Sequence, residues 1–387
     1  MSFSDAFSSS GRDLRLWGKL RSLNWGVVAL VTAISCIGFG LLYSVAGGSF
    51  EPWAERQMVR FAIGMALLIG VALINLRTWF QLAYPIYGVS LLLLVAVEFV
   101  GRMGKGAERW IDIGPLQLQP SELMKIALIL ALSRFLHGVL LDDVSRPTRL
   151  LPALLLIVMP AGLVLLQPNL GTAAILIAGG CGLIFLAGLS WKIIVPVIVL
   201  GLAVVPIGWE FALKDYQKER VYTFLDPDSD PLGAGYNITQ SKIALGSGGI
   251  FGKGFGQGTQ SRLNFLPEKQ TDFIFTVLGE EFGLFGLMIL MGLYLALLIQ
   301  GLRIALSTRS QFGRLVAMGV CLNFLLYILI NTSMSMGLIP VVGIPLPLVS
   351  YGGTALLTVL FGFGLLLSVQ IHRSVDIPRS ASGLWSS

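Results

Sequence analysis

Long runs of apolar residues, separated by short polar segments, extend along most of the chain. A run of roughly 17 to 25 apolar residues can cross the hydrocarbon core of a bilayer as one helix, which satisfies its own backbone polar groups there. The pattern predicts an all-α, polytopic integral membrane protein with about ten transmembrane helices. The predicted spans are residues 25–45, 57–74, 80–99, 119–137, 150–166, 170–188, 192–210, 272–301, 314–334 and 351–371.

One interruption is much longer than the others. Residues 211–271 are polar, charged and rich in glycine, with aromatic residues interleaved. Loops beyond about 15 residues are usually functional or disordered, and the aromatic residues favour order, so we expect one large extracytoplasmic loop that folds back over the helices. The predicted organisation is a cytoplasmic N-terminal segment 1–24, a transmembrane domain 25–373 that includes this loop, and a cytoplasmic C-terminal tail 374–387.

Arginine and lysine residues in the short loops predict the orientation. They are concentrated on the side of the two termini, which the positive-inside rule assigns to the cytoplasm. The first span follows its polar N-terminal segment without a small-residue cleavage site, so we expect it to remain uncleaved. The exceptions on the opposite side are Arg56, Arg60, Arg102, Lys105 and Arg109.

Composition narrows the classes of function. Only 12% of the residues are charged, about half the share in an ordinary soluble domain, and 55% are hydrophobic. The net charge of +6 comes from residues scattered between apolar runs, which favours positive-inside topology over nucleic-acid binding. The three cysteines lie inside apolar runs without a spaced partner, and both histidines are placed at cytoplasmic span ends. Chemistry on the outer face must then use neither histidine nor cysteine.

A charged pair lies at the start of the fourth predicted span. Pro120 and Ser121 suit the beginning of a helix, and Glu122 and Lys125 then lie three residues apart on one face, within pairing distance. Charged groups this close to hydrocarbon are costly and usually line a cavity. The alternative is an ion pair that only anchors the helix end. Arg109 precedes this pair in the same outer segment.

Three acidic residues lie where the long loop enters the eighth predicted span. Asp272 is expected at the outer mouth of this helix, and Glu280 and Glu281 about two turns deeper. Acidic residues below the membrane surface are costly unless they face the protein interior. A carboxylate at a helix N-terminus is also favoured by the helix dipole, so capping is the alternative for Asp272. Capping does not account for the two glutamates.

Two segments of the long loop carry weaker signals. The glycine-rich run 246–258 lacks the pattern of a phosphate-binding Walker loop, so we favour tight turns near the membrane surface over backbone donors for a lipid pyrophosphate. In residues 226–231, Asp alternates with turn residues, and turn formation explains most of the pattern. A divalent cation site is the alternative.

A proline-rich segment separates the last two predicted spans. Residues 337–347 contain three prolines and two glycines in an apolar region, and Ser350 follows them. Such a sequence breaks a helix at membrane depth, which is tolerated where the backbone is buried or lines a cavity. The segment either shapes a binding site or simply joins two spans.

Together these motifs resemble the SEDS family of shape, elongation, division and sporulation proteins. The similarity extends from residue 25 to residue 373, and elongation-type members are more similar than division-type members. One departure is Asn169, where the family often has Asp. The matching segments are Arg109-Trp110, Gln119 to Glu122, Gly235-Tyr236-Asn237, Leu266-Pro267-Glu268, Thr271-Asp272-Phe273, Gly343 to Pro347 and Ser350 to Gly353.

The resemblance implies a peptidoglycan glycosyltransferase of the bacterial inner membrane that polymerises lipid II into glycan strands at the outer leaflet during cell elongation. It implies a class B penicillin-binding protein as transpeptidase partner, together with other proteins of the elongation complex. Asp272 matches the family's essential carboxylate, and Glu122 and Lys125 match its fourth-span charged pair.

The mechanism we infer is a direct displacement in which Asp272 accepts the proton of the acceptor's GlcNAc 4-hydroxyl as this oxygen attacks C1 of MurNAc. Undecaprenyl pyrophosphate leaves, and its charge needs Lys, Arg or a divalent cation, Mg or Mn. No cofactor is certain. The residues expected to bind substrate are Arg109, Glu122, Lys125, Arg220, Gln240, Arg262, Lys269, Glu280 and Ser350.

Two other classes of function fit part of the sequence. A lipid II flippase or transporter would also have about ten helices, broken segments and intramembrane acids. Against it, no convincing internal repeat is found, and the polar groups concentrate on one face. A scaffold without chemistry would explain an ordered loop, but not the need for Asp272, Glu122 and Lys125 around one cavity.

Overall fold

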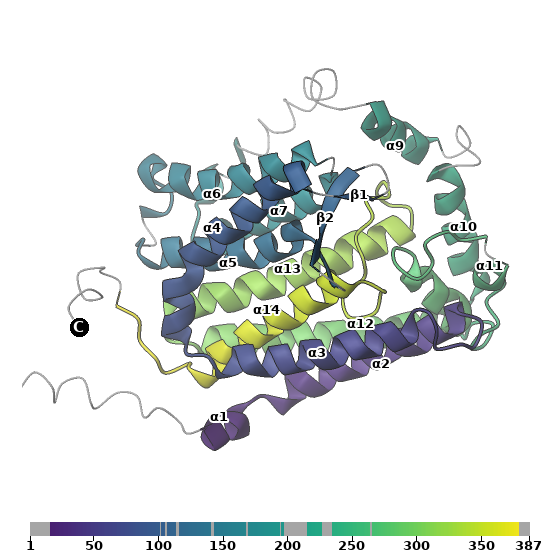
Figure 1. Ribbon diagram of the computed structural model, residues 1–387, viewed down its shortest axis with the longest axis horizontal. Helices are drawn as coiled ribbons and strands as arrows, with labels where there is room; N and C mark the ends of the chain where they lie inside the picture. Colours follow the sequence, from purple (N-terminus) through teal and green to yellow (C-terminus); the bar gives the residue numbers. More distant parts are fainter. Residues whose placement is uncertain are drawn as a thin grey trace, which may run out of the picture.

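Helices make up most of the described chain (Figure 1). The computed structural model describes residues 16–100, 102–104, 107–113, 116–140, 143–167, 169–193, 195–196, 215–226, 234–263 and 265–378. The helices are α1 (Leu16–Ser22), α2 (Trp25–Val45), α3 (Ala54–Leu73), α4 (Leu76–Val100), α5 (Pro120–His137), α6 (Pro147–Leu166), α7 (Leu170–Leu186), α9 (Asp215–Leu225), α10 (Ala234–Ser247), α11 (Thr259–Arg262), α12 (Ile274–Ser307), α13 (Gln311–Ser335) and α14 (Gly353–Ile371).

The helices agree with the predicted spans wherever a span falls on described residues. Seven of the described helices are long and apolar enough to cross a membrane, namely α2, α3, α4, α6, α12, α13 and α14. α7 is apolar but has 17 residues, and the 18 residues of α5 include Glu122, Lys125 and Arg134. The predicted span 192–210 lies almost entirely outside the described residues, so the count of ten helices stays a prediction.

A small antiparallel sheet occupies the connection between α4 and α5. Its strands are β1 (Arg102–Gly104), β2 (Ala107–Ile113) and β3 (Leu116–Leu118), in the order β1-β2-β3. Hydrophobic periodicity identified the helices on either side but gave no sign of these short strands. The sheet gives the segment around Arg109 a regular backbone.

α6 ends at Leu166 and α7 begins at Leu170. Asn169 is the N-cap residue of α7, where its Oδ1 accepts from the amide of Thr172 (3.4 Å). Gln167 Nε2 donates to the carbonyl of Leu94 (2.9 Å), which fixes the end of α6 against α4. Since Asn caps helices about as well as Asp, the departure from the family pattern leaves this cap in place.

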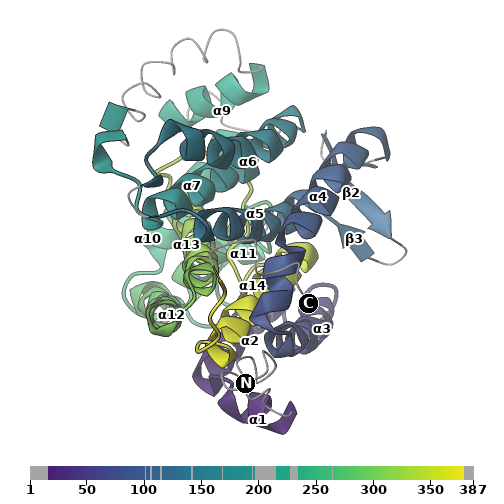
Figure 2. The same cartoon turned by 90° about the vertical axis from the view of Figure 1, so that its left-hand side faces the viewer.

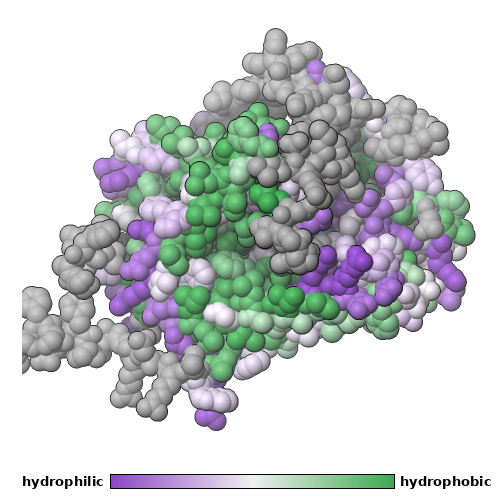
Figure 3. Space-filling view, in the orientation of Figure 1, coloured by the Kyte–Doolittle hydropathy of each residue, from purple (hydrophilic) through white to green (hydrophobic). Residues whose placement is uncertain are grey.

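α13 lies at the centre of the bundle. Figure 2, which looks along the bundle, shows α5, α7, α12 and α14 around it. Buried residues make up 67% of the apolar window of α13 and 78% of that of α14, but only 22% of that of α12. Apolar side chains also cover much of the middle of the face drawn in Figure 3. Helices that are apolar outward as well as inward belong in lipid.

The long loop contributes α9, α10 and α11. α10 packs against α12 and α13, as expected for a loop that folds back over the helices. In Figure 1, α10 and α11 lie at one end of the bundle, and α1 and the described C-terminal residues lie at the other. The loop and the two described ends of the chain are therefore on opposite sides of the bundle.

α12 is interrupted near its beginning. Gly283 has φ 64° and ψ −160°, outside the helical region, which leaves neighbouring backbone groups without partners in the helix. Loop 249–254 inserts there. Two of its amides donate to the carbonyls of Glu280 and Glu281 (3.0 and 2.9 Å), and two of its carbonyls accept from the amides that follow the break (2.9 and 3.0 Å). A Cβ on Gly252 would lie 2.1 Å from the carbonyl oxygen of Glu281, so glycine permits the approach.

Candidate functional site

Asp272 lies where the long loop enters α12. Its amide donates to the carbonyl of Glu268 (3.1 Å), and its carbonyl accepts from Asn331 Nδ2 (2.9 Å). The side chain is half-buried and lies next to Gly343, where a Cβ would be 3.5 Å from Oδ2 of Asp272. The N-cap residue of α12 is Phe273, and this cap has no side-chain hydrogen bond. Asp272 therefore precedes the cap position that the alternative interpretation required.

Asn331 joins Asp272 to the proline-rich segment. Its Nδ2 donates to the carbonyl of Asp272 and also to that of Ile344 (2.7 Å), and the residue is 0% exposed. A single buried amide group thus holds two loops that are far apart in the sequence. Of the two alternatives for the proline-rich segment, the structure favours the one in which it shapes a site.

Ser350 forms a second link between the same two loops. Its hydroxyl donates to the carbonyl of Thr271 (2.5 Å) and accepts from the amide of Leu346 (2.8 Å). The amide of Tyr351 donates to the carbonyl of Gln270 (2.9 Å). Ser350 is 4% exposed, so in this structure its hydroxyl fixes the backbone beside Asp272. Substrate binding by Ser350 stays a prediction.

The predicted pairing of Glu122 with Lys125 is confirmed. Lys125 Nζ lies 2.6 Å from Glu122 Oε1, and the two residues are 3% and 5% exposed. Tyr327 completes a triad, since its hydroxyl donates to Glu122 Oε2 (2.6 Å) and accepts from Lys125. Tyr327 and Asn331 are one turn apart on α13, so this helix connects the buried triad to the backbone of Asp272.

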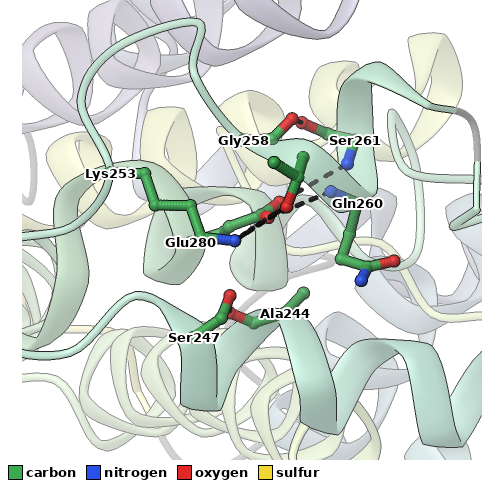
Figure 4. Close-up of polar contacts among 8 residues, drawn as sticks. Ala244, Ser247, Lys253, Gly258, Gln260, Ser261 and Glu280 are labelled. Atoms are coloured by element: carbon green, nitrogen blue, oxygen red, sulfur yellow. Dashed lines mark hydrogen bonds and ion pairs between the residues drawn. The ribbon is translucent and has the colours of Figure 1, made fainter.

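Glu280 lies in an enclosed network (Figure 4). Its carboxylate accepts from Lys253 Nζ (2.8 Å), from the hydroxyl of Thr259 (3.0 Å), and from the backbone amides of Gln260 (3.0 Å) and Ser261 (3.4 Å). It is 1% exposed. These contacts tie Lys253 of the loop and the first residues of α11 to α12. The role of Glu280 in substrate binding stays a prediction. In this structure its carboxylate holds the loop against α12.

Three other predicted residues have different environments. Lys269 is 8% exposed and its Nζ donates to the carbonyl of Ser261; burial lowers the pKa of this ammonium group. Arg262 is exposed, with Nη1 3.4 Å from Gln257 Oε1. Gln240 is half-buried on α10. Substrate binding by these three residues stays a prediction.

The remaining predicted features depend on side chains or residues that the structure does not describe. Arg109 belongs to β2 and Arg220 to α9, but the positions of their side chains are not described. Residues 227–231 of the aspartate-containing turn are also outside the described ranges. Among the residues that are described, no three His, Cys, Asp or Glu side chains are grouped so that they could hold a metal ion. The divalent cation stays a prediction.

Sequence reasoning missed four residues that position this site. Tyr327 and Asn331 gave a usable signal, because two polar groups four residues apart inside an apolar span share one helix face. Lys253 was considered only as part of a glycine-rich run. Gln57, whose Nε2 donates to the carbonyl of Ser350 (3.0 Å) and which is 1% exposed, gave no local signal.

Comparison with known proteins agrees with the motifs. Residues 21–375 match the profile of the FtsW, RodA and SpoVE family, described as cell cycle proteins. The chain is 47% identical over 330 residues to the peptidoglycan glycosyltransferase MrdB of Escherichia coli K12, covering 85% of this chain and 89% of that protein. It is 35% identical over 361 residues to the probable peptidoglycan glycosyltransferase FtsW of Trichlorobacter lovleyi, covering 89% and 92%.

Solved structures share the fold over nearly the whole chain. A chain from a peptidoglycan synthase complex that coordinates polymerization and crosslinking matches with a TM-score of 0.79 and 37% identity, covering 91% of this chain and 98% of that one. The rod shape determining protein RodA of Thermus thermophilus matches with a TM-score of 0.69 and 33% identity, covering 92% and 98%. This chain therefore belongs to the FtsW, RodA and SpoVE family, the SEDS proteins that its motifs resemble.

Proposed function

We propose that this chain is a peptidoglycan glycosyltransferase that polymerises lipid II into glycan strands during cell elongation. Its relative in Escherichia coli carries the name of that activity at 47% identity, and a probable enzyme of the same kind is 35% identical. The substrate is a disaccharide on undecaprenyl pyrophosphate. Each cycle extends the glycan and releases the lipid pyrophosphate.

This proposal depends on the exposure of the Asp272 side chain. Glu122, Glu280 and Glu281 are buried, with 5%, 1% and 1% of each residue exposed. Asp272 is half-buried, and its backbone is held by Asn331. A general base must come within hydrogen-bond distance of the hydroxyl it deprotonates. Of these four acids, Asp272 has the side chain that can meet a substrate without opening the bundle.

The proposed reaction is a single displacement assisted by one general base. Asp272 accepts the proton of the GlcNAc 4-hydroxyl while this oxygen bonds to C1 of MurNAc. The bond between C1 and the pyrophosphate oxygen breaks, and undecaprenyl pyrophosphate leaves with the bonding electrons. Displacement inverts C1, so an α-linked phosphate yields a β-1,4 glycosidic bond. A fixed backbone at Asp272 favours this step, because the base is held close to its attacking geometry before reaction.

Positive charge from Arg109, Lys125 or Arg220, or from a divalent cation, is proposed to assist the leaving group. The proposed partner is a class B penicillin-binding protein, which would supply crosslinking. The similar chain in a complex of polymerization and crosslinking supports this pairing.

The site is proposed to face outward from the inner membrane, with both termini cytoplasmic. In a cysteine-free background, a cysteine at Gln257 should react with an impermeant thiol probe in intact spheroplasts, and one at Ser374 should not. Both positions are exposed, so a cysteine that fails to react does so because of its side of the membrane and not because it is buried. The reverse labelling pattern would overturn this topology.

The decisive experiment is polymerisation of purified lipid II by the purified chain with its partner, with and without moenomycin. Moenomycin-resistant glycan synthesis is expected, which separates this activity from that of classical glycosyltransferase domains. Proteoliposomes that move lipid II between leaflets but form no glycan would favour the flippase alternative instead.

A further inference from the structure

Arg60 is a charged residue in the second turn of α3 that the reaction as described leaves unused. Its Nη1 is buried and has no hydrogen-bond acceptor among the described residues, and no described acidic side chain forms an ion pair with it. A buried donor left unpaired is costly, and such a group in a native fold calls for a partner. An arginine inside an apolar span usually marks a functional position.

The surroundings of Arg60 belong to the start of α14. Its guanidinium carbon lies 4.9 Å from the centre of the Tyr351 ring. Gly353 is so close that a Cβ there would be 3.1 Å from Nε of Arg60. One turn earlier on α3, Gln57 Nε2 donates to the carbonyl of Ser350, so α3 and the start of α14 are held together. The guanidinium is therefore fixed against the N-terminus of a membrane helix.

This helix end also favours negative charge. The N-cap residue of α14, Gly352, contributes no side-chain hydrogen bond, so the first amides of this 19-residue helix have no side-chain acceptor at that cap. Helix N-termini bind phosphate groups through such amides and through the helix dipole. A cationic side chain and a helix N-terminus thus meet at one place, and both favour an anion.

Arg60 and Asp272 are parts of one hydrogen-bonded assembly. Tyr351, which stacks on Arg60, donates its amide to the carbonyl of Gln270, and Ser350 donates its hydroxyl to the carbonyl of Thr271. Asp272 is the next residue. An anion bound at Arg60 would consequently have a defined position relative to the proposed base.

The other described candidates for binding a pyrophosphate are already engaged. Lys125 is paired with Glu122 inside the bundle, and Lys269 is buried with its ammonium group bonded to a backbone carbonyl. Arg262 is exposed beside Gln257. Of the described cations considered at this end of the bundle, Arg60 is the one with a buried donor that has no acceptor.

We propose that Arg60 binds the pyrophosphate group of the polyprenyl-linked substrate, with the first-turn amides of α14 as further donors. This inference rests on the proposed function. The planar guanidinium group can donate two parallel hydrogen bonds to phosphate oxygens, which a lysine cannot do. It would stabilise the charge that develops on the pyrophosphate as its bond to C1 breaks. No bond to Arg60 forms or breaks.

Binding to an inactive protein tests this role without turnover. In the Asp272→Asn background, we would measure the affinity for undecaprenyl pyrophosphate and for undecaprenol, which lacks the phosphates. Arg60→Gln should weaken binding of the pyrophosphate lipid about tenfold to a hundredfold. Arg60→Lys, which keeps the charge, should cause a smaller loss. Binding of undecaprenol should not change. Arg303→Gln removes an exposed arginine at the other end of the bundle and is the matched control.

A second variant leaves the arginine in place. Gly353→Ala puts a methyl group 3.1 Å from Nε and 3.2 Å from Cζ of Arg60, so it should displace the guanidinium and lower the affinity for the pyrophosphate lipid. Wild-type affinity in Arg60→Gln, or equal losses for both lipids, would overturn the proposal. A wild-type chain that fails to polymerise lipid II would instead overturn the proposed function. The binding comparison could still be interpreted, because it does not require turnover.

Discussion

Asp272 and Glu280, both near the beginning of α12, are held in opposite ways. At Asp272 the backbone is fixed, by Asn331 at the carbonyl and by Glu268 at the amide, while the carboxylate is half-buried. At Glu280 the carboxylate itself is fixed, by Lys253 and by neighbouring loop groups, and the residue is 1% exposed. A reacting carboxylate needs a rigid main chain and an accessible side chain. An anchoring carboxylate needs its oxygens satisfied.

Glu281 and Glu122 belong with the anchoring group. Glu281 Oε1 accepts from the hydroxyl of Ser44 on α2, and Glu122 is held by Lys125 and Tyr327. Both glutamates are at most 5% exposed. Acidic residues in a membrane protein are therefore not equivalent candidates for chemistry. The exposure of their side chains distinguishes Asp272 from the three glutamates.

The largest expected effect comes from Asp272→Asn. Asn keeps the size and most hydrogen bonds of Asp but cannot accept a proton, so polymerisation should fall about a hundredfold to ten-thousandfold. The protein should still fold and bind its partner, because the main-chain bonds at this residue do not involve the carboxylate. Glycan synthesis from purified lipid II and thermal unfolding in detergent measure the two quantities.

Glu280→Gln is the matched control for that variant. It weakens an anchored carboxylate, so it should lower the melting temperature while the folded fraction keeps most of its activity. Near wild-type polymerisation by Asp272→Asn would remove the assignment and return Glu122, Glu280 and Glu281 to candidacy.

Lys125→Met should have the next largest effect. It leaves Glu122 buried beside Tyr327 without its cation, and breaking a buried pair in this way typically costs about 3 to 5 kcal/mol of stability. The double variant Glu122→Gln/Lys125→Met should cost less than the sum of the two single changes, because no charge is then left unpaired. Thermal unfolding of all four proteins gives the coupling. Strictly additive losses would mean that the pair does not act as a unit.

Gly252→Ala should have a smaller effect, on folding. Gly252 has φ 79°, and its Cβ would lie 2.1 Å from the carbonyl oxygen of Glu281, so loop 249–254 would be pushed from the break in α12. Overpacking of this kind costs about 1 to 3 kcal/mol. Gly246→Ala is the control, since a Cβ at Gly246 in α10 meets nothing within 4 Å. Equal melting temperatures for both variants would show that the loop does not support α12.

The sequence predicted the parts of this molecule that local chemistry determines. The bilayer requires long apolar helices, so the spans could be identified, and helical spacing paired Glu122 with Lys125. Spacing did not distinguish Asp272 from Glu280; the resemblance to a family did. The partners that separate these acids lie far away along the chain. Tyr327 is 202 residues from Lys125, and contacts at such separation follow from packing that no local pattern records.

The connection between α4 and α5 shows the same limit. Residues 102–118 contain no periodic apolar pattern long enough to predict strands, yet they form three. The roles of Arg109 and Arg220 stay predictions, because they depend on side chains outside the described residues.

The insertion of loop 249–254 into α12 restricts how related sequences can diverge. Its four bonds to the helix are main-chain bonds, so they tolerate most side-chain changes but fix the number of residues between donors and acceptors. Insertions and deletions should accumulate elsewhere in residues 211–271 and be selected against in loop 249–254. By composition these six residues resemble a linker. By position they bond to the main chain of α12 on both sides of its break, so the loop and this helix should be inherited together.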